Sequence, residues 1–211
     1  MRRALIVLCA LAVLAPAQGA SQTSLDRFLS GLETLRVDFT QRLTDAGGRE
    51  LQRSTGRMVV VRPGRFRWEI RPTGSGDDAA QLLVSDGRNL WFYDRDLEQV
   101  TVKPAAAALT ATPAMLLSGG PDWRAAFDVD AGGRSGGLDW VTVTPRRPEA
   151  EFREARLGFS GERLVRMQLI DRLGQTASLE FTHGVRNGRV APDEVSFTPP
   201  PGVDVIGQPV S

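Results

Sequence analysis

Short runs of alternating apolar and polar residues dominate the chain beyond residue 35. In the stretch VRPGRFRWEI, Phe66, Trp68 and Ile70 fall on one face and Arg65, Arg67 and Glu69 on the other, the period-two pattern of a half-buried β-strand. Turn-forming pairs such as Asp86-Gly87 separate many of the runs. The pattern predicts about eleven strands, at 36–43, 56–61, 64–70, 81–85, 89–93, 98–102, 139–144, 152–159, 163–170, 175–182 and 194–198. No strand–helix alternation occurs, so we expect an antiparallel meander that forms a barrel or a strongly curved sheet.

A helix is predicted before the first strand. Its apolar residues follow the i, i+3, i+4, i+7 spacing of an amphipathic helix: Leu25, Phe28, Leu29, Leu32 and Leu35. Ser21, Thr23 or Ser24 could cap its start, because each offers a side-chain oxygen to a free backbone N–H.

A second helical region interrupts the strands at about 104–127. Thr112 followed by Pro113 indicates a helix start, and Gly119 fits a helix end. The run Pro121-Asp122-Trp123 could open another short helix. The insertion could simply plug one end of a barrel, or it could be a movable lid over an apolar cavity.

Apolar residues cover both faces of some predicted strands. Leu90 and Phe92 alternate with Trp91 and Tyr93, so neither face of that strand is polar. The two helical regions are the only covers that the pattern supplies. We therefore expect a concave sheet closed by helices around an apolar hollow. Its wall and lid are predicted to include residues that could equally be ordinary core: Phe66, Trp68, Leu82, Trp91, Met115, Leu116 and Leu117.

The N-terminal residues are typical of a secretory signal peptide. Arg2 and Arg3 precede an apolar run from residue 4 to 14, too short to span a membrane, and small residues follow up to Ala20. Cleavage could follow Ala17, Gly19 or Ala20. Cleavage after Ala20 would leave a single domain at 21–211 that we expect to be soluble in a bacterial periplasm.

Cysteine and charge narrow the chemistry of the exported protein. The single cysteine, Cys9, lies inside the apolar run, so the mature protein is expected to lack disulfides and acylation. Without Arg2 and Arg3 the chain holds 24 basic and 25 acidic residues, a net charge of about −1. The arginines are scattered, which argues against binding nucleic acid.

The search for catalytic or metal-binding residues finds no constellation. His183 is the only histidine, so a multi-histidine metal site is excluded, and no G-x-S-x-G motif occurs. We interpret His183 as a strand-end residue. The run Asp128 to Gly133 resembles the start of a calcium loop, but Gly132 stands where a ligand would be, and a hairpin turn explains it better. A carboxylate pair for glycoside hydrolysis stays open. We expect no enzyme activity, no cofactor and no metal.

Five segments, taken together and in order, resemble one known family. They are FTQ (39–41), VRPGRFRWE (61–69), LLVSDGRNLWFYDRDLEQVTV (82–102), TPAMLL (112–117) and FTPPPGVDVI (197–206). The chain is similar over nearly its whole mature length to the LolA family of periplasmic outer-membrane lipoprotein carriers. The resemblance implies an incomplete antiparallel barrel of about eleven strands, closed by a lid of short helices.

The same resemblance implies an activity. Family members take acylated lipoproteins released by the inner-membrane ABC transporter LolCDE, shield their acyl chains and pass them to the outer-membrane receptor LolB. An arginine of the family's RP motif bonds the lid helices and controls opening, and Arg62 matches it. We expect a monomeric chaperone on this basis. The alternatives are a carrier or sensor of another lipid or glycolipid on the same fold, and a periplasmic hydrolase.

Overall fold

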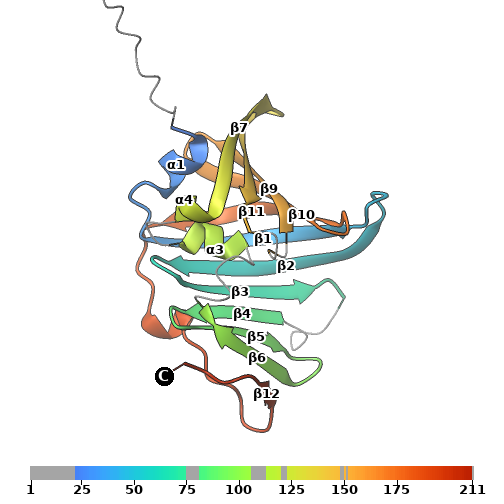
Figure 1. The fold of residues 1–211 in the computed structure, drawn as a ribbon, viewed down its shortest axis with the longest axis vertical. Coiled ribbons are helices and arrows are strands. Elements are labelled where there is room, and N and C mark those ends of the chain that lie inside the picture. Colours follow the sequence, from blue (N-terminus) through green and yellow to red (C-terminus); the bar gives the residue numbers. More distant parts are fainter. Residues whose placement is uncertain are drawn as a thin grey trace, which may run out of the picture.

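A single curved sheet forms the body of the protein (Figure 1). The computed structural model describes residues 22–74, 81–105, 113–119, 123–147, 150 and 152–210. Within these ranges the sheet has twelve strands, in the order β12-β6-β5-β4-β3-β2-β1-β11-β10-β9-β8-β7. Their bounds are β1 Thr34–Thr44, β2 Glu50–Val61, β3 Arg65–Pro72, β4 Gln81–Asp86, β5 Asn89–Asp94, β6 Gln99–Pro104, β7 Phe127–Ser135, β8 Leu138–Pro145, β9 Phe152–Ser160, β10 Arg163–Asp171, β11 Thr176–Arg186 and β12 Asp204–Ile206.

Two antiparallel meanders meet at β1. One runs from β1 to β6 and the other from β7 to β11, and β11 pairs with β1, for example Phe39 with Phe181. The short β12 adds in parallel to β6. Because β7 and β12 remain at opposite edges, the sheet does not close on itself. The predicted open, mainly antiparallel half-barrel is confirmed.

Among the described residues, three short helices lie against the concave side of this sheet (Figure 1). They are α1 Ser24–Leu29, α3 Pro113–Ser118 and α4 Trp123–Ala126. α1 packs on β8 and β9, α3 on β2 and β3, and α4 on β7. The helices therefore contact both meanders.

The helix boundaries follow local chemistry. Thr23 caps α1: its Oγ1 accepts from the Asp26 N–H at 3.2 Å while the Asp26 carboxylate accepts from the Thr23 N–H at 2.9 Å, a capping box. α3 begins at Pro113, as predicted. The predicted first helix is too long, because α1 ends at Leu29 and Gly31 turns the chain with a φ of 64°.

Ten of the predicted strands are present, but 194–198 is wrong as a strand. A 3-10 turn, Pro192–Val195, stands there, and the last strand comes later at β12. The Glu194 carboxylate accepts two hydrogen bonds from Nη2 of Arg36, at 2.7 and 2.8 Å, which fixes the turn on the convex face of the sheet. The three prolines that follow, at 199–201, lack the N–H that a strand ladder requires.

The hairpin turn predicted at Asp128 to Gly133 is also wrong. β7 continues through this stretch, and its register shifts between Ala131 and Arg134. Gly133, with a φ of 75°, takes the positive backbone angle that such a bulge favours. The turn instead lies at Gly136 and Gly137, where both φ values are positive.

The apolar core is divided by the sheet into two clusters. The larger one fills the concave side and includes residues from α1, α3 and both meanders. The smaller one lies on the convex side of β4–β6, where Phe197 and Val203 of the C-terminal segment pack against Trp91. The helices are therefore not the only cover: the C-terminal segment covers the second apolar face, which explains why that strand pattern is apolar on both sides.

Asp86 connects the strand ends of the smaller cluster. Its carboxylate accepts hydrogen bonds from Nε1 of Trp91 at 2.9 Å and from the N–H groups of Arg88 and Asn89 at 2.8 and 2.7 Å. Partial burial raises the pKa of Asp86, but these bonds outweigh it and the net effect lowers the pKa. The ionised carboxylate therefore stabilises the folded protein above the unfolded-state pKa of 3.8, and this contribution is lost as the pH falls through the lower folded-state pKa.

An Asp86→Asn variant is expected to lose about 1–2 kcal/mol of unfolding free energy at pH 7, because the bonds to a charged acceptor are weakened. The deficit should shrink as the pH falls below 3.8. Urea unfolding of both proteins from pH 7 to pH 3 measures it. Asp130→Asn, which removes the same charge from an exposed position of β7, should change little at any pH. A deficit that stays constant with pH would contradict this role of the carboxylate.

Candidate functional site

The candidate site is the contact between the turn after β2 and the ends of two helices. Nη2 of Arg62 donates to the Gly119 carbonyl just beyond α3 at 2.9 Å, and Nη1 donates to the Leu29 carbonyl at the end of α1 at 3.2 Å. One guanidinium thus joins the C-terminal ends of helices that pack on different halves of the sheet.

The chemistry of helix ends explains why an arginine suits this position. The last carbonyls of a helix have no intrahelical partner, and they carry partial negative charge. A guanidinium offers several N–H donors in a fixed plane, so one side chain reaches two carbonyls. Burial of the Arg62 guanidinium lowers its pKa, yet an arginine remains charged at neutral pH, so both bonds are charge-assisted.

The backbone of the same turn adds to this contact. The Gly64 N–H donates to the Ser118 carbonyl at 2.7 Å, which is a second bond to the end of α3. The Arg62 N–H donates to the Glu33 carbonyl at 2.8 Å, ahead of β1. The Arg62–Pro63 peptide bond is cis, and Gly64 has a φ of 74°. The turn is therefore fixed to the body of the sheet while it holds α3.

A further ion pair links the helices to each other. Arg124 of α4 bonds the Asp26 carboxylate of α1, the same carboxylate that completes the capping box. This pair was not predictable from the sequence pattern, because its residues lie 98 positions apart. The three helices form a connected cover.

Four of the predicted cavity residues lie together where α3 meets the concave face of the sheet. Phe66, Leu116 and Leu117 have no exposed surface, and Trp68 is 6% exposed; all four belong to the concave cluster. Met115 lies in α3, and its side chain falls outside the described part of the structure. α3 thus covers the aromatic face of β3.

The structure places Leu82 and Trp91 elsewhere. Trp68 pairs with Leu83, so Leu82, the residue before it on β4, faces the opposite side of the sheet. Trp91 pairs with Val84 and shares that convex side, where Nε1 of Trp91 bonds Asp86. Neither residue lies in the concave cluster, so their prediction as cavity wall is corrected.

The other half of the concave surface was missed from the sequence. It consists of buried β8–β11 side chains that belong to the same concave cluster: Val141, Val143, Phe152, Leu157, Phe159, Met167, Leu179 and Phe181. Their alternation was recognised as strand pattern. Only the order of strands in space shows that they face Phe66 and Trp68 across the half-barrel.

Apolar surface extends beyond the helices along the concave side. Along β3, Phe66 and Trp68 are buried and Ile70 is half-buried. Across the strands, Leu83 is half-buried and its neighbour Phe92 on β5 is 39% exposed. Nε1 of Trp68 is buried and, within the described residues, has no hydrogen-bond partner. The site offers a broad apolar surface with few fixed polar groups, which suits flexible chains more than a rigid polar ligand.

Neither a metal cluster nor a spanning helix is found in the described part of the chain. Over those ranges, no group of three or more His, Cys, Asp or Glu side chains is arranged to hold a metal ion. None of the helices described is long and apolar enough to cross a membrane. His183 lies within β11, at a bulge with a φ of 52°, and not at the end of the strand.

Known proteins resemble this chain over most of its length. The family model "Outer membrane lipoprotein carrier protein LolA" matches residues 30–198. The outer-membrane lipoprotein carrier protein of Chromobacterium violaceum is 40% identical over 192 residues, covering 91% of this chain and 90% of the relative. The protein of the same name from Methylibium petroleiphilum is 38% identical and covers 99% and 100%. A crystal structure of an uncharacterised conserved protein from Thermus thermophilus has the same fold, with a TM-score of 0.51, 15% identity and coverage of 87% and 96%.

The fold of the Thermus thermophilus protein agrees with the curved sheet described above. Relatives with this much identity over nearly the full chain share its family. The chain therefore belongs to the LolA family of outer-membrane lipoprotein carrier proteins, whose members carry cargo and are not enzymes.

Proposed function

We propose that the protein is a periplasmic chaperone for lipoproteins. It accepts an acylated lipoprotein released from the inner membrane by LolCDE, shields the acyl chains on the concave face and delivers the cargo to LolB at the outer membrane. The observation that carries this proposal is the bridge from Arg62 to the carbonyls of Leu29 and Gly119. It supports a cover that is held by a few polar bonds and can be released.

Acyl chains need such a cover because they are apolar and avoid water. Each CH₂ group buried contributes about 0.8 kcal/mol, so a lipid anchor with several long chains strongly favours leaving water. Packing of the chains against residues such as Phe66 and Trp68 would bury apolar surface without requiring a fixed orientation of the chains. Weak, non-directional contact also allows the chains to leave when a better acceptor is present.

The closed cover opposes cargo binding, which aids release. In the closed state Leu116 and Leu117 are fully buried beneath the cover. Cargo must displace these contacts and the Arg62 bonds, so part of the binding energy is spent on opening. The net affinity is then low enough for transfer onward.

The proposal is tested by release from inner-membrane vesicles. Vesicles that contain LolCDE and a radiolabelled lipoprotein are incubated with ATP, with and without the purified protein. We expect lipoprotein in the supernatant only when the protein is present, as a one-to-one complex. Release of equal amounts without the protein, or with bovine serum albumin in its place, would contradict the function.

A further inference from the structure

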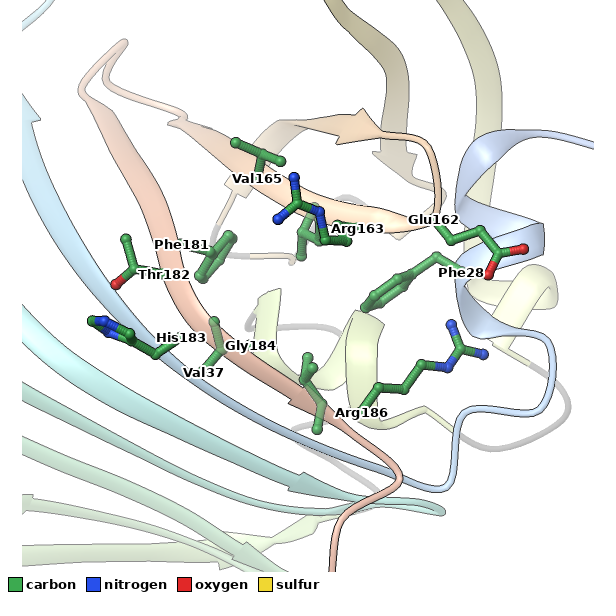
Figure 2. A pocket seen from close by; sticks show the side chains of 12 residues that line it. Phe28, Val37, Glu162, Arg163, Val165, Phe181, Thr182, His183, Gly184 and Arg186 are labelled. Carbon is green, nitrogen blue, oxygen red and sulfur yellow. The ribbon is translucent and has the colours of Figure 1, made fainter.

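A second apolar pocket lies in the wall of the half-barrel, between β10 and β11 (Figure 2). It has a volume of about 230 Å³. That space fits part of one extended chain and not a whole lipid anchor.

The pocket exists because two strands part. β10 and β11 pair from Ile170 with Thr176 as far as Arg166 with Glu180, and their pairing ends there. Beyond this point β10 continues to pair only with β9, and β11 only with β1. Both of these pairings contain a register shift. In the β10–β9 pair it lies between Leu164 and Arg166, and in the β11–β1 pair it lies at His183, whose φ is 52°. Bulges of this kind bend strands, and here they separate the two edges.

The floor of the pocket belongs to the same apolar core that the helices cover. Phe28 of α1, Val37 and Phe181 line the pocket and are 3%, 5% and 9% exposed. All three are members of the concave cluster, and Leu164 packs against it. In Figure 2, Phe28 and Phe181 lie on either side of the opening between the strands. The pocket is thus a side opening in the wall that reaches the core beside α1.

The positively charged side chain of Arg186 lies at the edge of this apolar pocket. Arg186, at the end of β11, lies with its guanidinium over the Phe28 ring, 5.7 Å from the centroid, and Nη2 donates to the Ser30 carbonyl. Nη1 is buried and finds no acceptor among the described residues. Glu162 is on the same rim, but no ion pair joins it to Arg186 in the part of the chain that the structure describes. The guanidinium is the positive charge that Arg186 places at this edge of the pocket, and it attracts an acceptor oxygen on a ligand.

We propose that this pocket binds the carbonyl end of a single alkyl chain, with the carbonyl or carboxylate oxygen at the guanidinium of Arg186 and the first methylene groups on Phe28, Phe181 and Leu164. This inference rests on the proposed function, because the alkyl chain is one acyl chain of the lipoprotein anchor. The same chemistry is offered by a free fatty acid, so both sources are tested. The site lets one chain lie in the wall while the others lie beneath the cover.

Photolabelling locates the chain directly. The unaltered protein is irradiated with a synthetic triacylated lipopeptide that carries a diazirine near the carbonyl of its amide-linked chain, and labelled residues are mapped by mass spectrometry. Free diazirine palmitic acid forms the second arm. We expect labels in 162–165 and 181–186 from the lipopeptide, and competition by unlabelled lipopeptide. Labels in these segments from the free acid alone would make the pocket a fatty-acid site and overturn its role in cargo binding.

Three variants separate the pocket from general effects. Arg186→Gln should reduce labelling of these segments by about tenfold to a hundredfold, because a charge-assisted bond is lost. Gly184→Leu keeps Arg186 and adds bulk to the pocket wall, where an added Cβ meets nothing within 4 Å, and it should reduce labelling similarly. Arg153→Gln removes the same charge from an exposed position of β9 outside the pocket and should label as the unaltered protein does.

The outcomes distinguish the two proposals. Labels confined to α3 and the strands beneath it would keep the carrier function and overturn the wall site. Labels at neither place, with a lipopeptide that also fails to bind by equilibrium dialysis, would count against the carrier function itself. If Arg186→Gln and Gly184→Leu both retain native circular dichroism and unchanged labelling of 162–165 and 181–186, the wall site is wrong.

Discussion

An Arg62→Leu variant is expected to take up lipoprotein from inner-membrane vesicles as well as the unaltered protein does, and to fail to pass it to LolB. Leucine donates no hydrogen bond, so the carbonyls of Leu29 and Gly119 lose their shared partner. Each charge-assisted bond contributes about 1.5–3 kcal/mol, so closure of the cover loses at least about 3 kcal/mol. Cargo then competes against a weaker closed state and is held roughly a hundredfold more tightly.

The measurement is a two-step transfer. Complexes of labelled lipoprotein with each variant are incubated with LolB, and the cargo on each protein is counted after separation. Arg62→Lys keeps the charge but cannot place two planar donors, so its transfer should be intermediate. Arg42→Leu removes an arginine from an exposed position of β1 and is the matched control. Normal transfer by Arg62→Leu would overturn the latch.

The same variant has a signature that requires no partner protein. Loss of the latch should lower the melting temperature of the empty protein by about 6–12 °C, since about 1 kcal/mol corresponds to 2–4 °C for a chain of this size. The loaded protein has already given up the latch, so its melting temperature should not change. A variant that is destabilised equally in both states would have a structural defect and not a latch defect.

The alternating pattern predicted most of the strands, and each wrong prediction has an identifiable physical cause. Ten strands were predictable because alternation at period two depends on the sequence alone. β7 was missed because its glycine pair reads as a turn, whereas the ladder to β8 absorbs it as a bulge. Segment 194–198 reads as a strand, but the bond from Arg36 to Glu194, 158 residues apart, favours a turn. Tertiary contacts decided both cases.

The site was less predictable than the fold. Residue alternation placed Phe66 and Trp68 on one face, but it could not show that Leu82 and Trp91 face the C-terminal segment instead of the helices. No pattern singled out Arg62 among many arginines; only the family resemblance did. Its partners are backbone carbonyls 33 and 57 residues away. Every residue has such a carbonyl, so residue types alone do not show which ones Arg62 bonds.

Gly56 of β2 is expected to be the position where the smallest substitution causes the largest loss of stability. It pairs with Phe39 of β1 and with Ile70 of β3. A Cβ added to Gly56 would lie 2.0 Å from the Glu69 carbonyl oxygen and 2.3 Å from Cζ of Phe39. The absence of a side chain lets the Phe39 ring lie across the strand.

That ring joins the two halves of the concave core. Phe39 is 2% exposed and meets Trp68 edge-on at 5.7 Å between centroids and Phe181 at 6.4 Å. Trp68 belongs to the β1–β6 meander and Phe181 to the other. Displacing Phe39 therefore weakens the contact between the meanders, and the clash with a backbone oxygen cannot be relieved by a side-chain rotation.

Gly56→Ala is expected to lower the unfolding free energy by about 3 kcal/mol or more, at or above the upper end for overpacking. Denaturant unfolding gives the value. Gly184→Ala, on β11 with open space around the added Cβ, is the matched control and should be neutral or stabilising by up to about 1 kcal/mol. Phe39→Leu should cost less in the Gly56→Ala background than alone, because the ring is already displaced. Additive costs in this double-mutant cycle would show that Phe39 does not depend on the glycine.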